Sequence, residues 1–219
     1  MDIILSDIEG TLTTGSSWRA LGKYLTKHDK RWAYYLFILR WLPRFPFVKM
    51  GVVDQRKGMT AWMKDEISLL KGKTRKEIKE ISAWIVRNEM WPKRRTDIIH
   101  EVVQRQSSGA KIVLVSSAYQ PFAEAFAHHL DAEAIGTNLV YRQETLADLA
   151  VPVNAYQQKA ENVLAKYEGN TIIAAYGDTA SDIPMMELSQ EPVAVYPDQK
   201  LRRAAESRGW RVLDDRQTH

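Results

Sequence analysis

The sequence contains no cysteine, and this absence alone excludes several kinds of site. Without thiols the chain has no disulfide scaffold, no thiolate zinc or iron–sulfur centre and no cysteine nucleophile. Glycine and proline are sparse as well, at 11 and 8 of 219 residues, which excludes a fibrous or low-complexity chain. The N-terminus lacks a basic segment followed by a long apolar run, so we expect a cytoplasmic protein without a signal peptide.

Long apolar runs are also missing. The most apolar segment, residues 32–48, is interrupted by Arg40, Pro43, Arg44 and Pro46, well short of the about 20 residues that span a bilayer. Three interpretations of this segment stay open: a helix packed in the core, a contact between two copies, or a helix at a membrane surface. We favour packing against protein, within a monomer or a homodimer.

Charge is distributed unevenly along the chain. The net charge is only +4, yet residues 15–75 carry more than three Lys or Arg for each Asp or Glu, and the remainder is net acidic. The basic segment also contains four of the seven tryptophans: Trp18, Trp32, Trp41 and Trp62. This pattern is typical either of a solvated helical face above aromatic packing or of a surface that receives an anionic or amphiphilic partner.

Four apolar segments rich in β-branched residues predict the strands of a parallel sheet buried on both faces. Each runs into polar or glycine residues, as strands do where an α/β sheet presents a site at its carboxyl edge. Helical patterns alternate with them, which predicts a doubly wound, Rossmann-like α/β fold. The strands are 3–5, 111–115, 171–176 and 192–195; the helices are 91–107, one opening at Gln120, 155–167 and one capped by Asp198.

The segment between the first strand and residue 91 has no convincing strand. Thr74 and Glu77 form a capping-box pattern, which begins a helix. A structureless loop of this length is improbable in a compact domain, so we expect a small all-helical insertion domain. The predicted division is a core of residues 1–14 and 91–219 with an insert of residues 15–90.

The ends of the predicted strands bring acidic and hydroxyl side chains to one edge of the sheet, and a lysine lies on the helix before the third strand. Each residue alone has an ordinary explanation as a turn, a helix cap or a surface lysine. Together they can hold a hard divalent cation, supply a carboxylate that attacks, and bind an anion through serine and lysine. The set is Asp7, Glu9, Ser116, Lys159, Asp178 and Asp182.

The order and spacing of these residues resemble the four motifs of the haloacid dehalogenase superfamily. Residues 7–13 are similar to its D-x-D-G-T signature, residues 113–116 to its second motif, Lys159 to its third, and residues 177–182 to its G-D-x-x-x-D motif. The helical insert resembles the family's type C1 cap. The turn at residues 116–119 and the tail at 192–198 with Gly209 and Trp210 resemble the phosphoserine-phosphatase-like subfamily IB.

The resemblance implies a Mg²⁺-dependent phosphomonoester hydrolase. In that family Asp7 would attack phosphorus and form an aspartyl-phosphate, which water then hydrolyses. The metal would be held by Asp7, the backbone carbonyl of Glu9 and Asp178, with Asp182 supporting through water. The phosphoryl oxygens would be bound by Ser116, Lys159 and the backbone after Gly10.

Glu9 departs from the family pattern, because most of its phosphatases have Asp at this position. The residue is the general acid to the leaving group and then the base to water. Glutamate is one methylene longer, which moves the carboxyl by about 1 Å, a displacement that can matter to catalysis. We favour a working hydrolase; a phosphotransferase to an acceptor other than water and a catalytically weak or silent binding protein remain alternatives.

The substrate is expected to be a small-molecule phosphomonoester other than phosphoserine. Phosphoserine phosphatases bind the substrate amine with a Glu where this chain has Ser16 near Trp18, and the substrate carboxylate with an Arg that corresponds to Glu66. Arg56 would replace that Arg if the alignment register differs. The basic aromatic insert suits an apolar or aromatic phosphomonoester, or peripheral contact with an anionic membrane. No motif that reads nucleic acid bases is visible, so no nucleic acid partner is expected.

Overall fold

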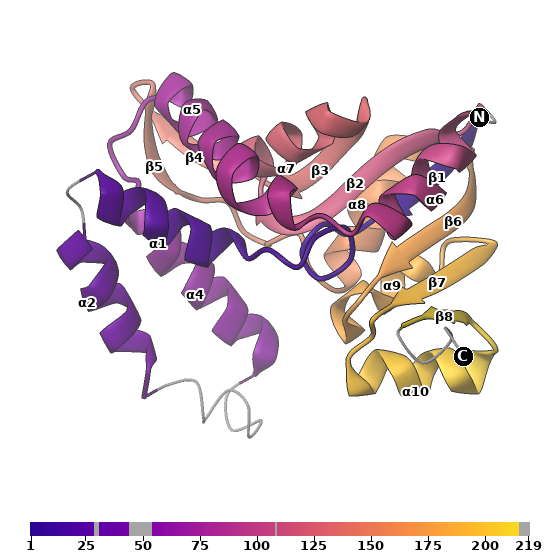
Figure 1. The fold of residues 1–219 in the computed structure, drawn as a ribbon. Helices are drawn as coiled ribbons and strands as arrows, with labels where there is room; N and C mark the ends of the chain where they lie inside the picture. The colour runs from indigo at the N-terminus through magenta and orange to yellow at the C-terminus, as the bar shows by residue number, and fades with distance from the viewer. Residues whose placement is uncertain (29–30, 44–53, 108, 215–219) are drawn as a thin grey trace.

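The computed structural model describes residues 1–28, 31–43, 54–107 and 109–214. At its centre lies a six-stranded sheet in the order β3-β2-β1-β6-β7-β8, in which every neighbouring pair is parallel (Figure 1). The predicted α/β class with a parallel sheet is therefore confirmed. The strands are β1 Asp2–Ser6, β2 Lys111–Tyr119, β3 Glu133–Thr137, β6 Thr171–Gly177, β7 Glu191–Val195 and β8 Arg211–Leu213.

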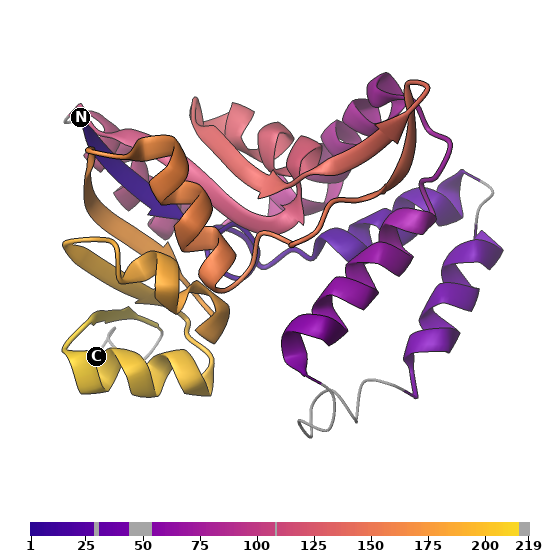
Figure 2. The ribbon, with the colours of Figure 1, turned by 180° about the vertical axis from the view of Figure 1, so that it is seen from behind.

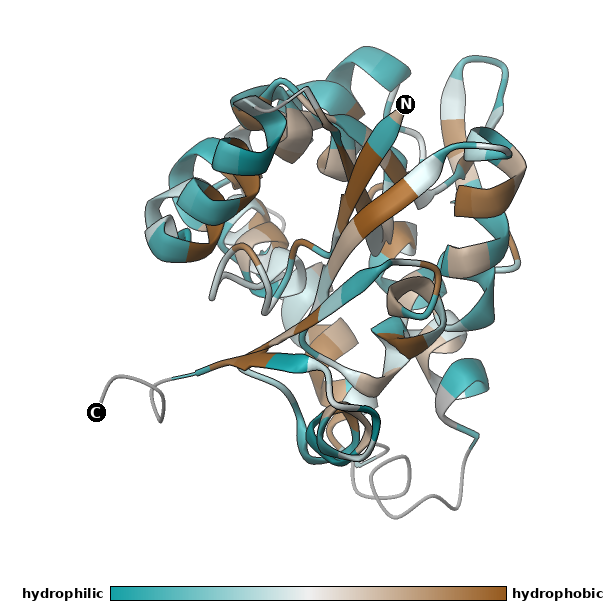
Figure 3. Cartoon of the chain, turned by 90° about the vertical axis from the view of Figure 1, so that its right-hand side faces the viewer, coloured by the Kyte–Doolittle hydropathy of each residue, from teal (hydrophilic) through white to brown (hydrophobic). Residues whose placement is uncertain are grey.

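Helices cover both faces of the sheet (Figures 1 and 2). Side chains alternate along a strand, so Ile4 packs with α6 and α7 on one face, whereas Ile3 and Leu5 pack with α8, α9 and α10 on the other. The apolar strands consequently lie inside the molecule, as Figure 3 shows. The helices are α6 Thr96–Ser107, α7 Gln120–Ala127, α8 Gln157–Tyr167, α9 Ile183–Met186 and α10 Gln199–Arg208.

The described part of residues 15–90, the predicted insert, contains helices joined by turns and no strand. Its helix α5 begins with a capping box, in which the Glu77 amide donates to Thr74 Oγ1 at 3.3 Å and the Thr74 amide donates to the Glu77 carboxylate at 2.8 Å. The chain leaves and re-enters the core side by side, because Arg95 N donates to Leu12 O at 2.8 Å. The elements are α1 Ser17–Lys27, α2 Arg31–Trp41, α4 Gln55–Ser68, α5 Arg75–Ile85, the π turn Val86–Met90 and the 3₁₀ turn Trp91–Lys93.

The apolar segment predicted at 32–48 is described only as far as residue 43, and its described part forms α2. The inner face of α2 packs in an aromatic cluster whose centre is Trp62 of α4. The ring of Trp62 lies 4.6 Å from Phe37, 5.2 Å from Trp41 and 5.5 Å from Trp18 of α1, measured between ring centroids. Among the described residues, no helix combines the length and the apolarity needed to cross a bilayer.

Two features differ from the predictions. The helix predicted from residue 91 begins only at Thr96, because Pro92 lies in a 3₁₀ turn and Arg94 is extended at φ −62° and ψ 148°. An unpredicted antiparallel hairpin, β4 Leu139–Arg142 and β5 Thr145–Leu149, packs against α4 of the insert. Its turn places Gln143 and Glu144 at positive φ, a conformation usually signalled by Asn-Gly or Asp-Gly, so the usual sequence signature is missing.

Candidate active site

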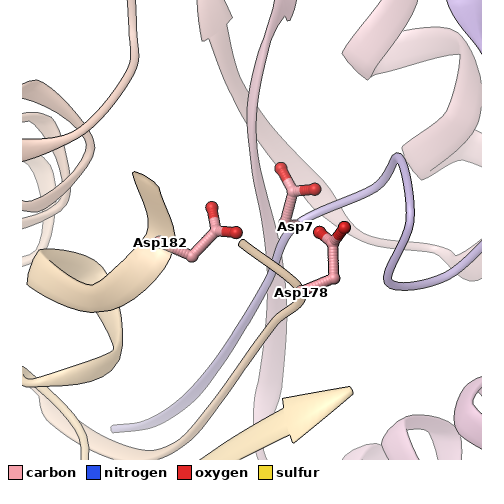
Figure 4. Close-up of side chains that lie close together, drawn as sticks. All are labelled: Asp7, Asp178 and Asp182. Carbon is pink, nitrogen blue, oxygen red and sulfur yellow. The ribbon is translucent and has the colours of Figure 1, made fainter. Parts of the chain in front are cut away.

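Three carboxyl groups converge at the carboxyl edge of β1 and β6 (Figure 4). Asp7 directly follows β1, Asp178 follows β6, and Asp182 ends the short 3₁₀ turn Ala180–Asp182. The two strands are parallel neighbours, and the Asp7 amide donates to Tyr176 O at 2.9 Å, so their ends meet. One oxygen of each carboxyl lies within 4.8 Å of the other two, which makes the group a candidate metal site.

Lys159 joins two of these carboxylates. Its Nζ, on α8, donates to Asp7 Oδ1 and to Asp182 Oδ1 at 2.6 Å each, and the residue is 1% exposed. The other oxygen of Asp182 accepts hydrogen bonds from the amide and hydroxyl of Thr179 at 3.0 Å each. Burial alone would lower the pKa of Lys159, but Asp182 and Asp7 raise it above the ordinary value, so the lysine stays charged.

The cluster nevertheless has too little positive charge, with one ammonium for three carboxylates. Burial, together with repulsion from Asp182, raises the pKa of Asp7 to about 7 against the opposing effect of Lys159. Burial and the charge of Asp7 raise the pKa of Asp178 to about 8. A divalent cation would restore the balance, and a donor set of oxygens alone is the kind that Mg²⁺ prefers. The residues present therefore fit a magnesium ion.

Gly10 is required by its surroundings. Its φ is +88°, and a Cβ at this position would lie 2.0 Å from Asp178 Oδ2. Two hydrogen bonds hold the partners of this contact in place. Thr11 Oγ1 donates to Asp178 Oδ1 at 3.1 Å, and Arg95 Nε donates to Gly10 O at 3.1 Å. The loop that follows β1, which we call the first loop, therefore brings its backbone close to the Asp178 carboxylate. Only glycine permits so close an approach.

We expect Gly10→Ala to reduce turnover of any substrate by about 100-fold, because the new Cβ must push Asp178 away by about 1 Å or more. The control is Gly169→Ala, which has a similar φ of +76° but no atom within 4 Å of the new Cβ. Both variants carry the backbone penalty of about 1–2 kcal/mol for positive φ. Equal activities in the two purified variants would show that the contact with Asp178 is unimportant.

The Glu9 carboxylate contacts the start of the insert. Ser17, the first residue of α1, donates to it from its amide and from its hydroxyl, each at 2.7 Å. Burial raises the pKa of Glu9, and the two hydrogen bonds from Ser17 oppose that rise. A carboxyl with a raised pKa suits a general acid. The longer side chain of Glu9 thus reaches a partner that belongs to the insert.

Ser116 lies on β2, the neighbour of β1 in the sheet, and is 2% exposed. Its Oγ accepts from the amide of Ala118 at 3.2 Å, and its carbonyl accepts from Nδ2 of the buried Asn154 at 2.8 Å. Sequence reasoning missed Asn154, and it also gave no role to the side chains of Thr11 and Ser17. Thr11 lies within the signature at residues 7–13, which could have indicated its role. Nothing in the sequence indicates the contacts of Asn154 and Ser17.

The residues predicted to select the substrate have different surroundings. Trp18 is half-buried against Trp62, and Arg56 is exposed with its guanidinium 5.0 Å from the ring of Tyr156. Glu66 is only 8% exposed, and no hydrogen bond or ion pair joins its side chain to another described residue. Burial and the charge of Glu9 raise the pKa of Glu66 to about 8.

Two known proteins from other sources are similar in sequence to this chain. The "Inhibition of morphological differentiation protein" of Streptomyces azureus is 31% identical over 167 residues, which are 74% of this chain and 59% of that protein. "Phosphoserine phosphatase SerB1" of Mycobacterium tuberculosis is 24% identical over 223 residues, covering 96% of this chain and 70% of the relative.

A solved protein of unknown function from Bordetella pertussis has the same fold, with a TM-score of 0.78 and 18% identity over 97% of this chain and 98% of the other. The family described as haloacid dehalogenase-like hydrolase matches residues 4–187, which contain Asp7, Lys159, Asp178 and Asp182. Since this match covers most of the sequence, the chain belongs to the haloacid dehalogenase-like hydrolase family.

Proposed function

We propose that this chain is a Mg²⁺-dependent phosphomonoester phosphatase that acts through an aspartyl-phosphate, with residues 15–90 serving as its cap. The observation that carries the proposal is the buried cluster of Asp7, Asp178 and Asp182 around Lys159. It combines a carboxylate at a strand end with an excess of negative charge that a divalent cation would neutralise. The name of the mycobacterial relative, a phosphoserine phosphatase, supports phosphate ester chemistry.

In this proposal Asp7 is the nucleophile. Its carboxylate attacks phosphorus, the bond to the leaving oxygen breaks, and water later cleaves the aspartyl-phosphate to release phosphate. Mg²⁺, held by Asp7, Asp178 and the Glu9 carbonyl with support from Asp182, would shield the approach of one anion to another. Lys159 holds Asp7 in position through the 2.6 Å hydrogen bond and, with Ser116 and the backbone after Gly10, would bind phosphoryl oxygens.

Glu9 is proposed to donate a proton to the leaving group and then to accept one from water. Its hydrogen bonds from Ser17 orient the carboxyl, and burial favours the protonated form that the first step needs. Transfer to an acceptor other than water is the alternative within the same chemistry, because the longer side chain changes where the base lies.

The substrate is proposed not to be phosphoserine. Glu66 stands where phosphoserine phosphatases are expected to bind the substrate carboxylate, and it is a buried carboxyl that offers no positive charge. A carboxylate brought from the substrate would lose its hydration there without gaining a cation as a partner. The aromatic cluster around Trp62 instead suits an apolar or aromatic body on the phosphomonoester.

A panel of phosphomonoesters tests the proposal. Phosphoserine, lysophosphatidate and an aryl phosphate would be assayed with Mg²⁺ and with a chelator, on the wild type and on Glu9→Asp. We expect Mg²⁺-dependent phosphate release from the aryl or lipid phosphate, and at least about tenfold less from phosphoserine. Absence of turnover on every ester would favour a catalytically silent binding protein. A gain of hydrolysis in Glu9→Asp would show that Glu9 restrains attack by water.

A further inference from the structure

Helix α2 is apolar on both sides, although only one side packs closely against other described residues. Its inner face carries Phe37 and Trp41, which are 6% and 4% exposed in the aromatic cluster. Its outer face carries large apolar side chains that are more than half exposed, at spacings of three and four residues that place them in one stripe. We call these residues the α2 stripe: Trp32 (70%), Tyr35 (53%), Leu36 (65%), Leu39 (64%) and Leu42 (56%), the last just beyond the helix.

The α2 stripe is unlike the rest of the described surface. The other exposed large apolar residues are Met1, Val140, Val151 and Leu164, which belong to different parts of the fold. Scattered apolar residues are normal on a protein surface, whereas a contiguous patch marks a contact with something else. Helix α2 also lies at the outer edge of the insert, on the side away from the sheet (Figures 1 and 2).

Basic residues border the stripe on both sides. At about 100° per residue, Arg31 and Arg40 fall on opposite flanks of the apolar side chains. The helix contains no Asp or Glu. One neighbouring acid, Asp65 of α4, lies 3.6 Å from Arg40 Nε and offsets part of this charge.

We propose that the α2 stripe docks this protein on the surface of an anionic phospholipid bilayer. A helix lying in the interface buries its apolar side about 5–10 Å deep, and Leu36 and Leu39 lie at the middle of the side that would be buried. Trp32 and Tyr35 are residue types that settle at the level of the lipid headgroups. The flanking arginines face lipid phosphates and extend their charged ends toward them.

A second copy of the chain fits this surface less well. In a two-fold dimer the same patch faces itself, so the arginine flanks would meet arginine flanks. A stable interface also needs about 20–30 residues on each side, far more than the stripe provides. An anionic membrane matches both the small apolar area and the mainly positive charge that surrounds it.

The test is co-sedimentation of the full chain with vesicles of phosphatidylcholine alone or mixed in equal parts with phosphatidylglycerol. We expect retention on the anionic vesicles at low salt, reduced at about 1 M salt, where the screening length is about 3 Å. The double variant Leu36→Ser/Leu39→Ser should lose about tenfold or more in vesicle partitioning. Leu164→Ser is the matched control, because Leu164 is a 49% exposed leucine on α8 of the core.

Both variants should retain the wild-type melting temperature and the wild-type activity on a water-soluble aryl phosphate, which separates loss of docking from loss of folding. The proposal is independent of the phosphatase assignment, because binding to vesicles needs no turnover. It is overturned by equal sedimentation with and without anionic vesicles, by full retention of the double variant, or by a concentration-dependent dimer that the double variant abolishes. The last result would assign the stripe to a second copy.

Discussion

Asp7→Asn is expected to reduce phosphomonoester turnover by about 10³-fold or more while the protein remains folded. The amide oxygen of asparagine can still accept the hydrogen bond from Lys159, now 2.6 Å from Asp7 Oδ1, but the side chain cannot form the aspartyl-phosphate. Removing one negative charge from a cluster of three carboxylates also relieves repulsion. The measurement is phosphate release at saturating substrate, with and without Mg²⁺.

Asp97→Asn is the control for this substitution, since Asp97 is an exposed residue in the first turn of α6, outside the cluster. It should turn over substrate as the wild type does. Thermal unfolding of Asp7→Asn should show a melting temperature equal to or above that of the metal-free wild type. Near-normal turnover by a folded Asp7→Asn protein would contradict the proposed nucleophile and would leave the carboxylate cluster without its main proposed catalytic role.

Glu66→Gln is expected to stabilise the protein at alkaline pH and to change little at acidic pH. The pKa of Glu66 is raised from 4.5 to about 8, mainly by burial and then by Glu9, so the folded state holds a proton that the unfolded state releases between these values. The stability of the wild type therefore falls as pH rises through this window, by as much as about 1.4 kcal/mol per pH unit from this one group. Glutamine does not titrate and escapes the loss.

Urea unfolding at about pH 5 and about pH 8 measures the effect, which is on the order of a few kcal/mol at the higher pH. Glu206→Gln on the exposed surface of α10 is the matched control, and it should leave the pH profile of the wild type unchanged. Parallel profiles for Glu66→Gln and the wild type would mean that a cation or donor accompanies Glu66 in solution. In that case its exclusion of substrate carboxylates would need another cause.

The parallel sheet was predictable because four of its strands are continuous apolar runs, which have few other stable locations. Residues 133–137 contain glutamate, glycine and threonine around a single isoleucine, so β3 carries no such signal. The outer strand β8 has only three residues, Arg211–Leu213, too few for a periodic pattern. Both strands form because their neighbours supply a sheet edge, which is tertiary information that sequence patterns do not contain.

The candidate site also has contacts that the sequence predicts and contacts that it does not. The meeting of Asp7 with Asp178 was predictable, because carboxyl ends of parallel strands share one edge of the sheet. The hydrogen bonds of Glu9 with Ser17 were not, since they depend on where the insert folds back over the first loop. The depth at which Glu66 is buried likewise depends on how α4 packs. The hydrolase family is shown, while the magnesium, the individual catalytic roles and the boundaries of the insert remain predictions.

The hydrogen bonds from Ser17 to Glu9 affect the order in which substrate entry and bond cleavage would occur. A movement that carries α1 away from the first loop must break two hydrogen bonds to a carboxylate, each worth about 1.5–3 kcal/mol. The same movement would leave Glu9, the proposed proton donor, without a fixed orientation. With α1 away from the loop, Glu9 would not be oriented to protonate a leaving group. With α1 against the loop, Glu9 would be oriented but the site would be closed. Admission of substrate and cleavage would then alternate within each cycle, with a single methylene of Glu9 providing the reach that links them.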